Sequence, residues 1–240
     1  MSRPAKSTTL TQKVHGQLKM AILAGRFRPG ERLPLAALAK EHGVSLSVLR
    51  EAVTRLAEQE LIISEPQLGF RVKPLSAEDL SDLTAVRVDI ETLALRRSIA
   101  RGDVAWEARV IAAHHTMDRM RPTADTELHQ EAAEAHLNFH ADVLAACGSP
   151  RLIKIATDLR ESAELYQRWA APFGLQEGRD AIREHRDLLD AMLDRDTERA
   201  VAVLTQHIQR TAQLLLDHAD ELTGDAAALP RPDPHLNEDS

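Results

Sequence analysis

The sequence predicts a mainly α-helical protein, in which three helices and a small β-hairpin precede an all-α bundle of six to seven helices. Three observations support this fold class. Aromatic residues, which favour strands, make up only 3% of the 240 residues. Apolar residues recur with the spacing of a helix along most of the chain. Short extended segments occur only before residue 74. Since 43% of the residues are hydrophobic, the chain can form a substantial core.

Changes in composition divide the chain into five segments. We expect a disordered tail over 1–9, a first domain over 10–74 and a linker over 75–78, where Pro74 precedes the change of pattern. The second domain is expected over 79–223. A second disordered tail, rich in proline and polar residues, is expected over 224–240.

The first domain contains three helical patterns and two extended ones. The helices are expected over 11–24, over 35–41, and from a cap at Ser45 or Ser47 to residue 59. Gly43 separates the second helix from the third. The extended segments are expected over 61–64 and 70–73, and the residues 65–69 between them form a turn. In the second domain, apolar stripes predict helices over 79–100, 103–120, 126–147, 150–169, 178–194 and 197–222.

The net charge of −7 is the sum of a basic N-terminal part and an acidic remainder. Residues 1–74 contain twelve Lys and Arg and six Asp and Glu, so they carry +6, whereas residues 75–240 carry −13. A basic first domain on an acidic chain indicates an anionic partner for that domain, with nucleic acid the leading candidate. Chance clustering of charges on a solvated surface is the alternative.

Other features of the composition exclude whole classes of protein. No apolar run approaches the length of a transmembrane helix, so no membrane partner is expected. The N-terminus lacks the apolar segment of a secretory signal, so we expect a cytoplasmic protein. The one cysteine, Cys147, excludes a disulfide scaffold and a cysteine-rich zinc module.

Residues 35–56 have the form helix, glycine-centred turn, helix. In this architecture the second helix enters the major groove of DNA with its N-terminal residues facing the bases. Those residues here are Ser45, Ser47 and Arg50, whose side chains can bond bases or phosphates. Further arginines, among them Arg28 and Arg32, could contact phosphates. A generic three-helix domain with scattered arginines is the alternative.

Four of the eleven histidines lie on apolar helix faces. His136 and His140 are four residues apart and share one face. His185 and His207 lie ten residues before and twelve after Arg195, where two helices should turn back on each other, so their rings should lie at nearly the same height. Four imidazoles together could bind a divalent metal such as zinc or nickel. Four separate core histidines are the alternative.

The first domain resembles the winged helix-turn-helix of the GntR family of bacterial transcription regulators. The resemblance covers residues 11–73 and rests on the segments RPGERL, LAKEHGVSLSVLREAVTRLAEQELI and GFRV. It implies DNA contacts by Arg50 and by a wing that contains Gly69. The family commonly has Arg, Pro and Arg where this chain has Leu46, Val48 and Leu68. The loss of two charged positions implies weaker DNA binding or a different operator.

Residues 79–222 resemble the FCD ligand-binding domain, which marks the FadR subfamily. The segments that carry this resemblance are AVRVDIETLALR, FHADVLAACGSPRL and EHRDLLDAMLDRDTERA, together with His207. The resemblance implies a metal held by His140, His185 and His207, with His136 at the position of the usual oxygen ligand. A fourth imidazole favours Zn or Ni over Mn. It also implies that Arg87 helps to bind an acidic effector, and a salt bridge from Arg87 to Glu91 is the structural alternative.

These features favour a ligand-responsive transcription regulator rather than an enzyme. Repression is the commoner mode of action in the family that the chain resembles, so a repressor is expected. We expect a homodimer on a palindromic double-stranded DNA operator, with DNA affinity controlled by a small carboxylic acid at the metal. One alternative is a regulator for which the metal itself is the effector. A helical metalloenzyme acting on a small acid is a weaker alternative, because the sequence contains no HExxH, GxSxG or phosphate-loop motif.

Overall fold

The computed structural model describes residues 10–23, 26–120, 126–170 and 181–217. These residues form two compact units. The first contains the described residues up to Ser76 together with 164–170, and the second contains Ala77–Ala163 and 181–217. The predicted class is confirmed, because a winged helix-turn-helix is followed by an all-α bundle. The tails expected over 1–9 and 224–240 lie outside the described residues.

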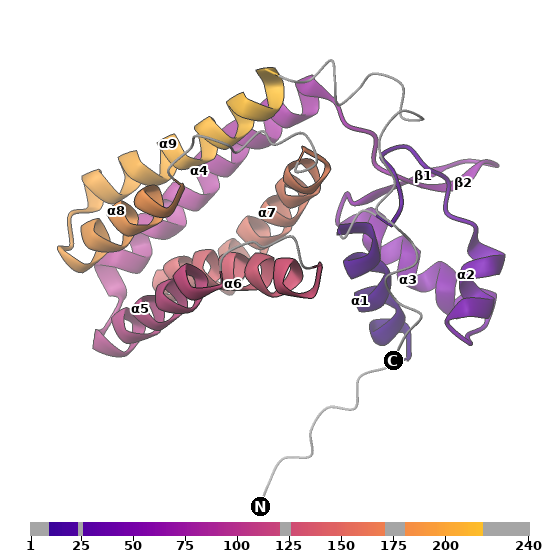
Figure 1. Cartoon of the computed structure of the whole chain (residues 1–240), viewed down its shortest axis with the longest axis horizontal. Helices are drawn as coiled ribbons and strands as arrows, with labels where there is room; N and C mark the ends of the chain where they lie inside the picture. Colours follow the sequence, from indigo (N-terminus) through magenta and orange to yellow (C-terminus); the bar gives the residue numbers. More distant parts are fainter. Residues whose placement is uncertain (1–9, 24–25, 121–125, 171–180, 218–240) are drawn as a thin grey trace, which may run out of the picture. The chain divides into compact units, whose positions relative to one another are not determined.

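In the first unit, three helices pack beside a small hairpin (Figure 1). The helices are α1 (Leu10–Leu23), α2 (Leu35–Glu41) and α3 (Leu46–Glu58). Strands β1 (Ile62–Glu65) and β2 (Gly69–Val72) pair antiparallel, with Ile62 opposite Val72. The core of this unit is built from the apolar faces that the periodicity predicted, and it includes Leu18, Leu38, Leu49, Val53 and Ile62.

Local chemistry fixes the ends of these elements. The Ser45 hydroxyl accepts a hydrogen bond from the Val48 backbone N–H at 3.3 Å, so Ser45 caps α3. Gly43 and Gly69 have φ angles of +63° and +91°, which a residue with a side chain rarely adopts. The turn before α3 and the tip of the hairpin therefore depend on these glycines.

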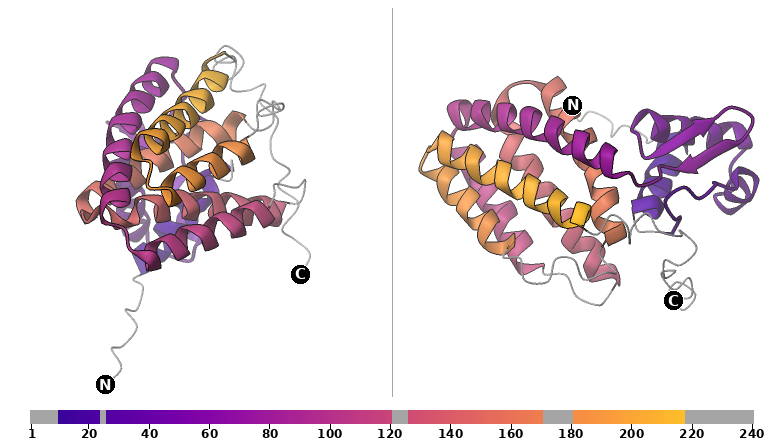
Figure 2. Two further views of the ribbon diagram at one scale, coloured as in Figure 1. Left: turned by 90° about the vertical axis from the view of Figure 1, so that its left-hand side faces the viewer. Right: turned by 90° about the horizontal axis from the view of Figure 1, so that it is seen from above.

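The second unit is entirely helical among the described residues. Its helices are α4 (Ala77–Arg101), α5 (Val104–Arg119), α6 (Thr126–Leu144), η1 (Ala145–Cys147), α7 (Pro150–Ala170), α8 (Ala181–Leu193) and α9 (Thr197–Asp217). Helices α4 and α9 lie side by side in both views of Figure 2. The end of α7 groups with the first unit.

Two element boundaries within the described residues differ from the expected ones by two or more residues. Helix α4 begins at Ala77 rather than 79, so the expected linker over 75–78 is half helical; Glu78 and Asp79 in its first turn suit the positive end of the helix dipole. The helix expected over 126–147 ends as an α-helix at Leu144 and continues as the 3₁₀ turn η1, which Gly148 ends with a φ of +73°.

The junction of α4 and α5 gives a test of packing. A Cβ atom on Gly102 would lie 2.0 Å from Cε3 of Trp106, which is 1% exposed and donates its indole N–H to the Asp142 carbonyl at 2.8 Å. Gly102→Ala is therefore expected to lower the free energy of unfolding by about 1–3 kcal/mol, measured by urea titration. Gly16→Ala is the control. Gly16 lies within α1 with nothing within 4 Å of its added Cβ, so this change should stabilise by about 0.5–1 kcal/mol. Equal effects of both substitutions would contradict this account.

Candidate metal centre and DNA-binding surface

Three helices of the second unit bring four histidines together. Helix α6 supplies His136 and His140, α8 supplies His185, and α9 supplies His207. One nitrogen from each ring lies within 4.8 Å of a nitrogen from every other ring. The Nε2 atom of His140 lies 3.2 Å from Nε2 of His136 and 3.2 Å from Nε2 of His185. These are the four histidines that the sequence singled out.

The turn between α8 and α9 explains how two of them meet. Arg195 occupies the left-handed region with a φ of +57°, and the chain reverses there so that α8 packs along α9. The ring centroids of His185 and His207 then lie 4.6 Å apart. The nearly equal distances of the two residues from Arg195 therefore do place them at one height.

The chemistry of this donor set fits a divalent metal. Zinc bonds imidazole nitrogen at about 2.0–2.1 Å, so two ligands of a tetrahedral ion lie roughly 3.3 Å apart, close to the two separations of 3.2 Å from His140. The pKa of His140 lies well below its ordinary value. Burial has the largest effect, and nearby positive charge on His136, Arg160 and the other two histidines lowers this pKa further. His140 is therefore neutral near pH 7, and neutral imidazole is the form that binds metal.

Contacts outside the four rings orient one of the possible ligands. The Nδ1 atom of His207 lies 2.9 Å from Oε2 of Glu184, and the other carboxylate oxygen accepts a hydrogen bond from Arg210 at 3.1 Å. A carboxylate behind an imidazole is the usual arrangement around a protein-bound metal, because it fixes the ring and raises its basicity. By contrast, the buried Nδ1 atom of His140 has no hydrogen-bond partner among the described residues.

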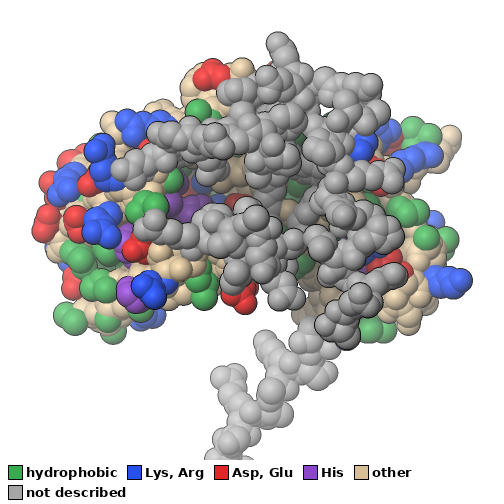
Figure 3. Space-filling view, viewed as in Figure 1, with side chains coloured by type: hydrophobic (Ala, Val, Ile, Leu, Met, Phe, Trp, Pro, Cys, Tyr) green, Lys and Arg blue, Asp and Glu red, His purple; other side chains and the backbone are tan. Residues whose placement is uncertain are grey.

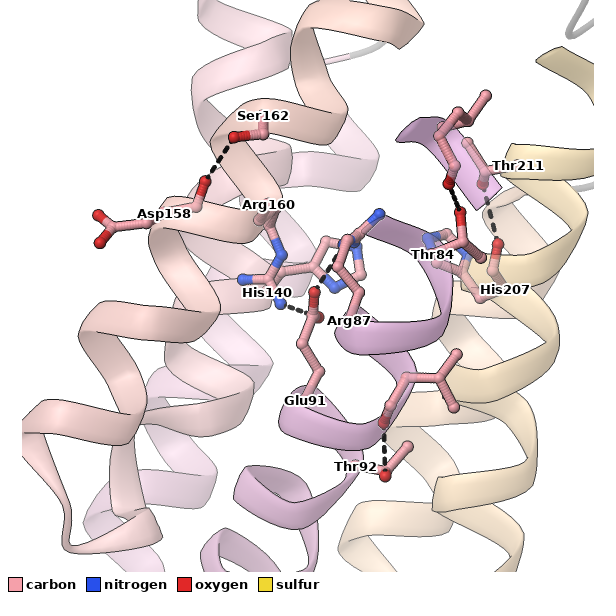
Figure 4. A network of polar contacts seen from close by, with 12 residues as sticks. Thr84, Arg87, Glu91, Thr92, His140, Asp158, Arg160, Ser162, His207 and Thr211 are labelled. Carbon is pink, nitrogen blue, oxygen red and sulfur yellow. Dashed lines mark hydrogen bonds and ion pairs between the residues drawn. The ribbon is translucent and has the colours of Figure 1, made fainter. Parts of the chain in front are cut away.

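A buried ion network lies next to this cluster (Figure 4). Glu91 of α4, which is 0% exposed, accepts a hydrogen bond from Arg87 Nε at 2.9 Å and a second from the Arg160 guanidinium of α7. Burial alone would raise the pKa of Glu91, but the charges of Arg160 and Arg87 outweigh burial and lower it. Arg87 thus makes the salt bridge that was the structural alternative for it. Glu91 therefore bonds one guanidinium group from its own helix and one from α7.

Arg160 and Glu184 are the site residues that sequence reasoning missed. Arg160 lies 69 residues from its partner Glu91, and no local pattern connects them. Glu184 directly precedes a histidine that was selected, and its partner His207 lies 23 residues further along. Its position one residue before His185, at the same height on the helical hairpin, was a signal that could have found it.

The residues expected to bind DNA lie on the first unit. Ser45, Ser47 and Arg50 are exposed at the start of α3, and the hydroxyl oxygens of the two serines lie 3.0 Å apart. Arg50 forms no ion pair with any described residue. Arg55, one turn and a half further along α3, is paired instead with Glu51 at 2.6 Å.

The other basic residues have partly structural positions. Arg32 donates a hydrogen bond at 2.5 Å to the backbone carbonyl of Leu68 at the hairpin tip, so it holds the wing. Arg28 is half-buried, and its backbone N–H donates to the Glu31 carboxylate at 2.8 Å. Gly69 follows Leu68, whose side chain is 54% exposed. On the face of the second unit seen in Figure 3, basic and acidic side chains are interspersed.

This chain joins a winged helix-turn-helix to an all-α domain, an arrangement typical of bacterial transcription regulators. The description "Bacterial regulatory proteins, gntR family" matches residues 10–72, and the FCD domain matches residues 82–210. The chain belongs to the GntR family, with an FCD domain as in the FadR subfamily. It is therefore a transcription regulator and not an enzyme.

Individual relatives agree with this membership. The chain is 31% identical over 214 residues to the HTH-type transcriptional regulator BphR of Paraburkholderia xenovorans, covering 88% of this chain and 87% of that protein. It is 31% identical over 195 residues to the HTH-type transcriptional repressor GlaR of Escherichia coli, covering 80% of this chain and 89% of that protein. The structure of E. coli McbR/YncC shares the fold, with a TM-score of 0.74 at 21% identity over 89% of this chain and all of that one. Among the helices that the structure describes, none is both long and apolar enough to cross a membrane.

Proposed function

We propose that this regulator responds to a small carboxylic acid, which binds at a divalent metal in the FCD domain and changes the affinity of a homodimer for a palindromic operator. We propose that the regulator is a repressor, because two relatives that align with this chain over most of their length are named as repressors. The observation that carries the proposal is the convergence of four buried or half-buried imidazoles in one domain of a DNA-binding regulator.

The ligand set proposed for the metal is His136, His140, His185 and His207. All four donors are neutral nitrogen atoms, which suit Zn or Ni better than Mn. When bound, the ion would supply a positive charge able to hold a carboxylate. The protein would hold the four rings in position around the ion. The contact of Glu184 with His207 fixes one of these rings.

The role proposed for Arg87 is to hold the acid. Arg87 is buried, and among the described residues its guanidinium donates only from Nε, to Glu91, so its two terminal nitrogens are not used within this network. A buried positive charge is costly without an anion, and the fork of a guanidinium matches a carboxylate. A bound acid would shift the balance between conformations that differ in DNA affinity.

A screen of small carboxylic acids by thermal shift, with metal-loaded and chelator-treated protein, tests this proposal. An acid at a hundred times its Kd should stabilise the native state by about 2.7 kcal/mol, and only when metal is present. A stabilising acid that acts equally well after chelation would contradict the role of the metal.

A metal-responsive regulator is a second candidate, favoured by the number of protein donors. If the ion is tetrahedral, four side-chain ligands complete its shell, as in structural zinc sites, and leave no position for an acid. Under this alternative, metal alone changes operator affinity and no acid adds to the effect. Titrating operator DNA with and without metal, in the absence of any acid, separates the two candidates.

The proposed DNA contact predicts the effect of one substitution on α3. Arg50→Ala is expected to weaken specific operator binding by about 1–3 kcal/mol, since an exposed guanidinium at this position would bond a base or a phosphate. Fluorescence anisotropy with labelled operator measures the change. Arg55→Ala is the matched control, because this side chain is already paired with Glu51 and should matter much less. Unchanged affinity of the Arg50 variant would exclude the proposed contact.

A further inference from the structure

The outer face of α4 carries an exposed stripe with an internal symmetry. Between residues 86 and 100, the exposed side chains of this helix are those of Val86, Asp89, Leu93, Arg97 and Ala100. Their spacing of three, four, four and three residues keeps them on one side of a helix. Val86 and Leu93 are 38% and 41% exposed although both are apolar. We call these five residues the α4 stripe.

Leu93 is the centre of this stripe. Asp89 lies four residues before it and Arg97 four residues after it, about 6 Å away along the axis in each direction. Val86 and Ala100 lie seven residues before and after it, and both are apolar. If a second copy of α4 lay antiparallel across this face, Leu93 would meet its own counterpart. Asp89 would then face the partner subunit's Arg97, and the same ion pair would form a second time.

The charged members of the stripe are available for such a contact. Neither Asp89 nor Arg97 makes a hydrogen bond or an ion pair with another described residue. Other charged residues of α4 are already engaged within the chain. Arg87 bonds Glu91, and the neighbour of Arg97, Arg96, bonds Glu198 of α9. Helix α4 lies at the edge of the helical unit beside α9 in both views of Figure 2.

We propose that the α4 stripe is the contact between two copies of this chain, related by a two-fold axis that passes beside Leu93. An interface with a two-fold axis must complement itself, and an acidic and a basic residue placed equally far from one apolar centre satisfy this condition. The proposal rests on the proposed function, since it assigns a surface to the homodimer that would bind the operator.

Substitution at the centre of the stripe gives the first test. Leu93→Asp would place two carboxylates against each other on the two-fold axis, so we expect the dissociation constant of the dimer to rise about a hundredfold or more. Sedimentation velocity of the full chain measures this change. Val104→Asp is the control. Val104 is 78% exposed at the start of α5, outside the stripe, and its substitution should leave the dimer unchanged.

Charge reversal gives a second test that does not depend on one variant. Asp89→Arg places Arg against Arg twice in each dimer, and Arg97→Asp places Asp against Asp twice. Each variant alone should therefore be mostly monomeric at concentrations where the unmodified chain is dimeric. An equimolar mixture of the two should form heterodimers, because each contact then joins opposite charges. Circular dichroism of each variant establishes that it is folded.

The outcomes separate this inference from the proposed function. An unmodified chain that is monomeric, a Leu93→Asp variant that stays dimeric, or a folded pair of charge variants that does not recombine would overturn the α4 contact. Operator binding is measured in parallel on the unmodified chain. A dimer that persists in all variants, together with operator binding by the unmodified chain, leaves the regulator intact with another interface. A chain that pairs through α4 but binds no operator contradicts the proposed function alone.

Discussion

Glu91→Ala is expected to lower the free energy of unfolding by about 3–5 kcal/mol, because it leaves two buried guanidinium groups without their shared carboxylate. Arg87 and Arg160 are 7% and 6% exposed, so water cannot replace the lost partner without rearrangement of α4 and α7. The measurement is chemical denaturation of the purified protein. Such a loss is a large part of the stability of a typical domain.

The control for this effect is an acidic residue of the same helix that faces solvent. Asp82→Ala removes an exposed carboxylate of α4 and should change the unfolding free energy by less than about 0.5 kcal/mol. Replacing Glu91, Arg87 and Arg160 together by apolar residues of similar volume should recover much of the loss, because the three charges of this network are then removed together. A single Glu91→Ala variant as stable as the Asp82→Ala variant would show that the network contributes little.

The dependence of this effect on pH has a definite sign. The two arginines hold the pKa of Glu91 below its ordinary value despite complete burial. A carboxyl with a lowered pKa in the folded state stabilises the fold above the unfolded value of about 4.3 and loses this contribution as the pH falls through the folded value. The difference in stability between the unmodified chain and Glu91→Gln should therefore be constant near pH 7 and shrink below about pH 4.

Periodicity could predict which side chains share a helix face, but not which faces meet. The histidines at 136 and 140 are neighbours on any helix, and the other two follow from a single turn at Arg195. The helix faces that carry the four histidines could therefore be predicted from spacing along the sequence. The contact of α6 with the α8–α9 pair is set by packing of the whole domain, for which the family resemblance was the only guide.

Buried charges are the part of the site that local rules misjudge. A charged residue in an amphipathic pattern is assigned to solvent, because burial is unfavourable without a partner. Arg160 is buried because its partner, Glu91, comes from a helix 69 residues away. Charge and spacing along the sequence carry no information about such a pair. The same limit applies to Glu184, whose partners His207 and Arg210 lie on the next helix.

His185→Ala combined with His207→Ala should abolish metal in the purified protein. Two of four donors are lost, and the remaining pair, His136 and His140, lies on one helix and cannot surround an ion. Metal content after dialysis, measured by mass spectrometry, is expected to fall from about one ion per chain to a trace. Chelator should lower the melting temperature of the unmodified chain and leave that of the double variant unchanged, since only a chain that binds metal is stabilised by it.

Three further variants make this result specific to the cluster. His115→Ala removes an exposed histidine of α5 outside the cluster and should leave the metal content unchanged. Glu184→Gln keeps all four rings but weakens the hold on His207, so metal affinity should fall by about 10–100-fold. His136→Ala tests the half-buried fourth ring: if three histidines suffice, the ion is retained with a coordination position free for an acid. Full metal content in the double variant would show that the ion binds elsewhere and that the four rings are packed core residues.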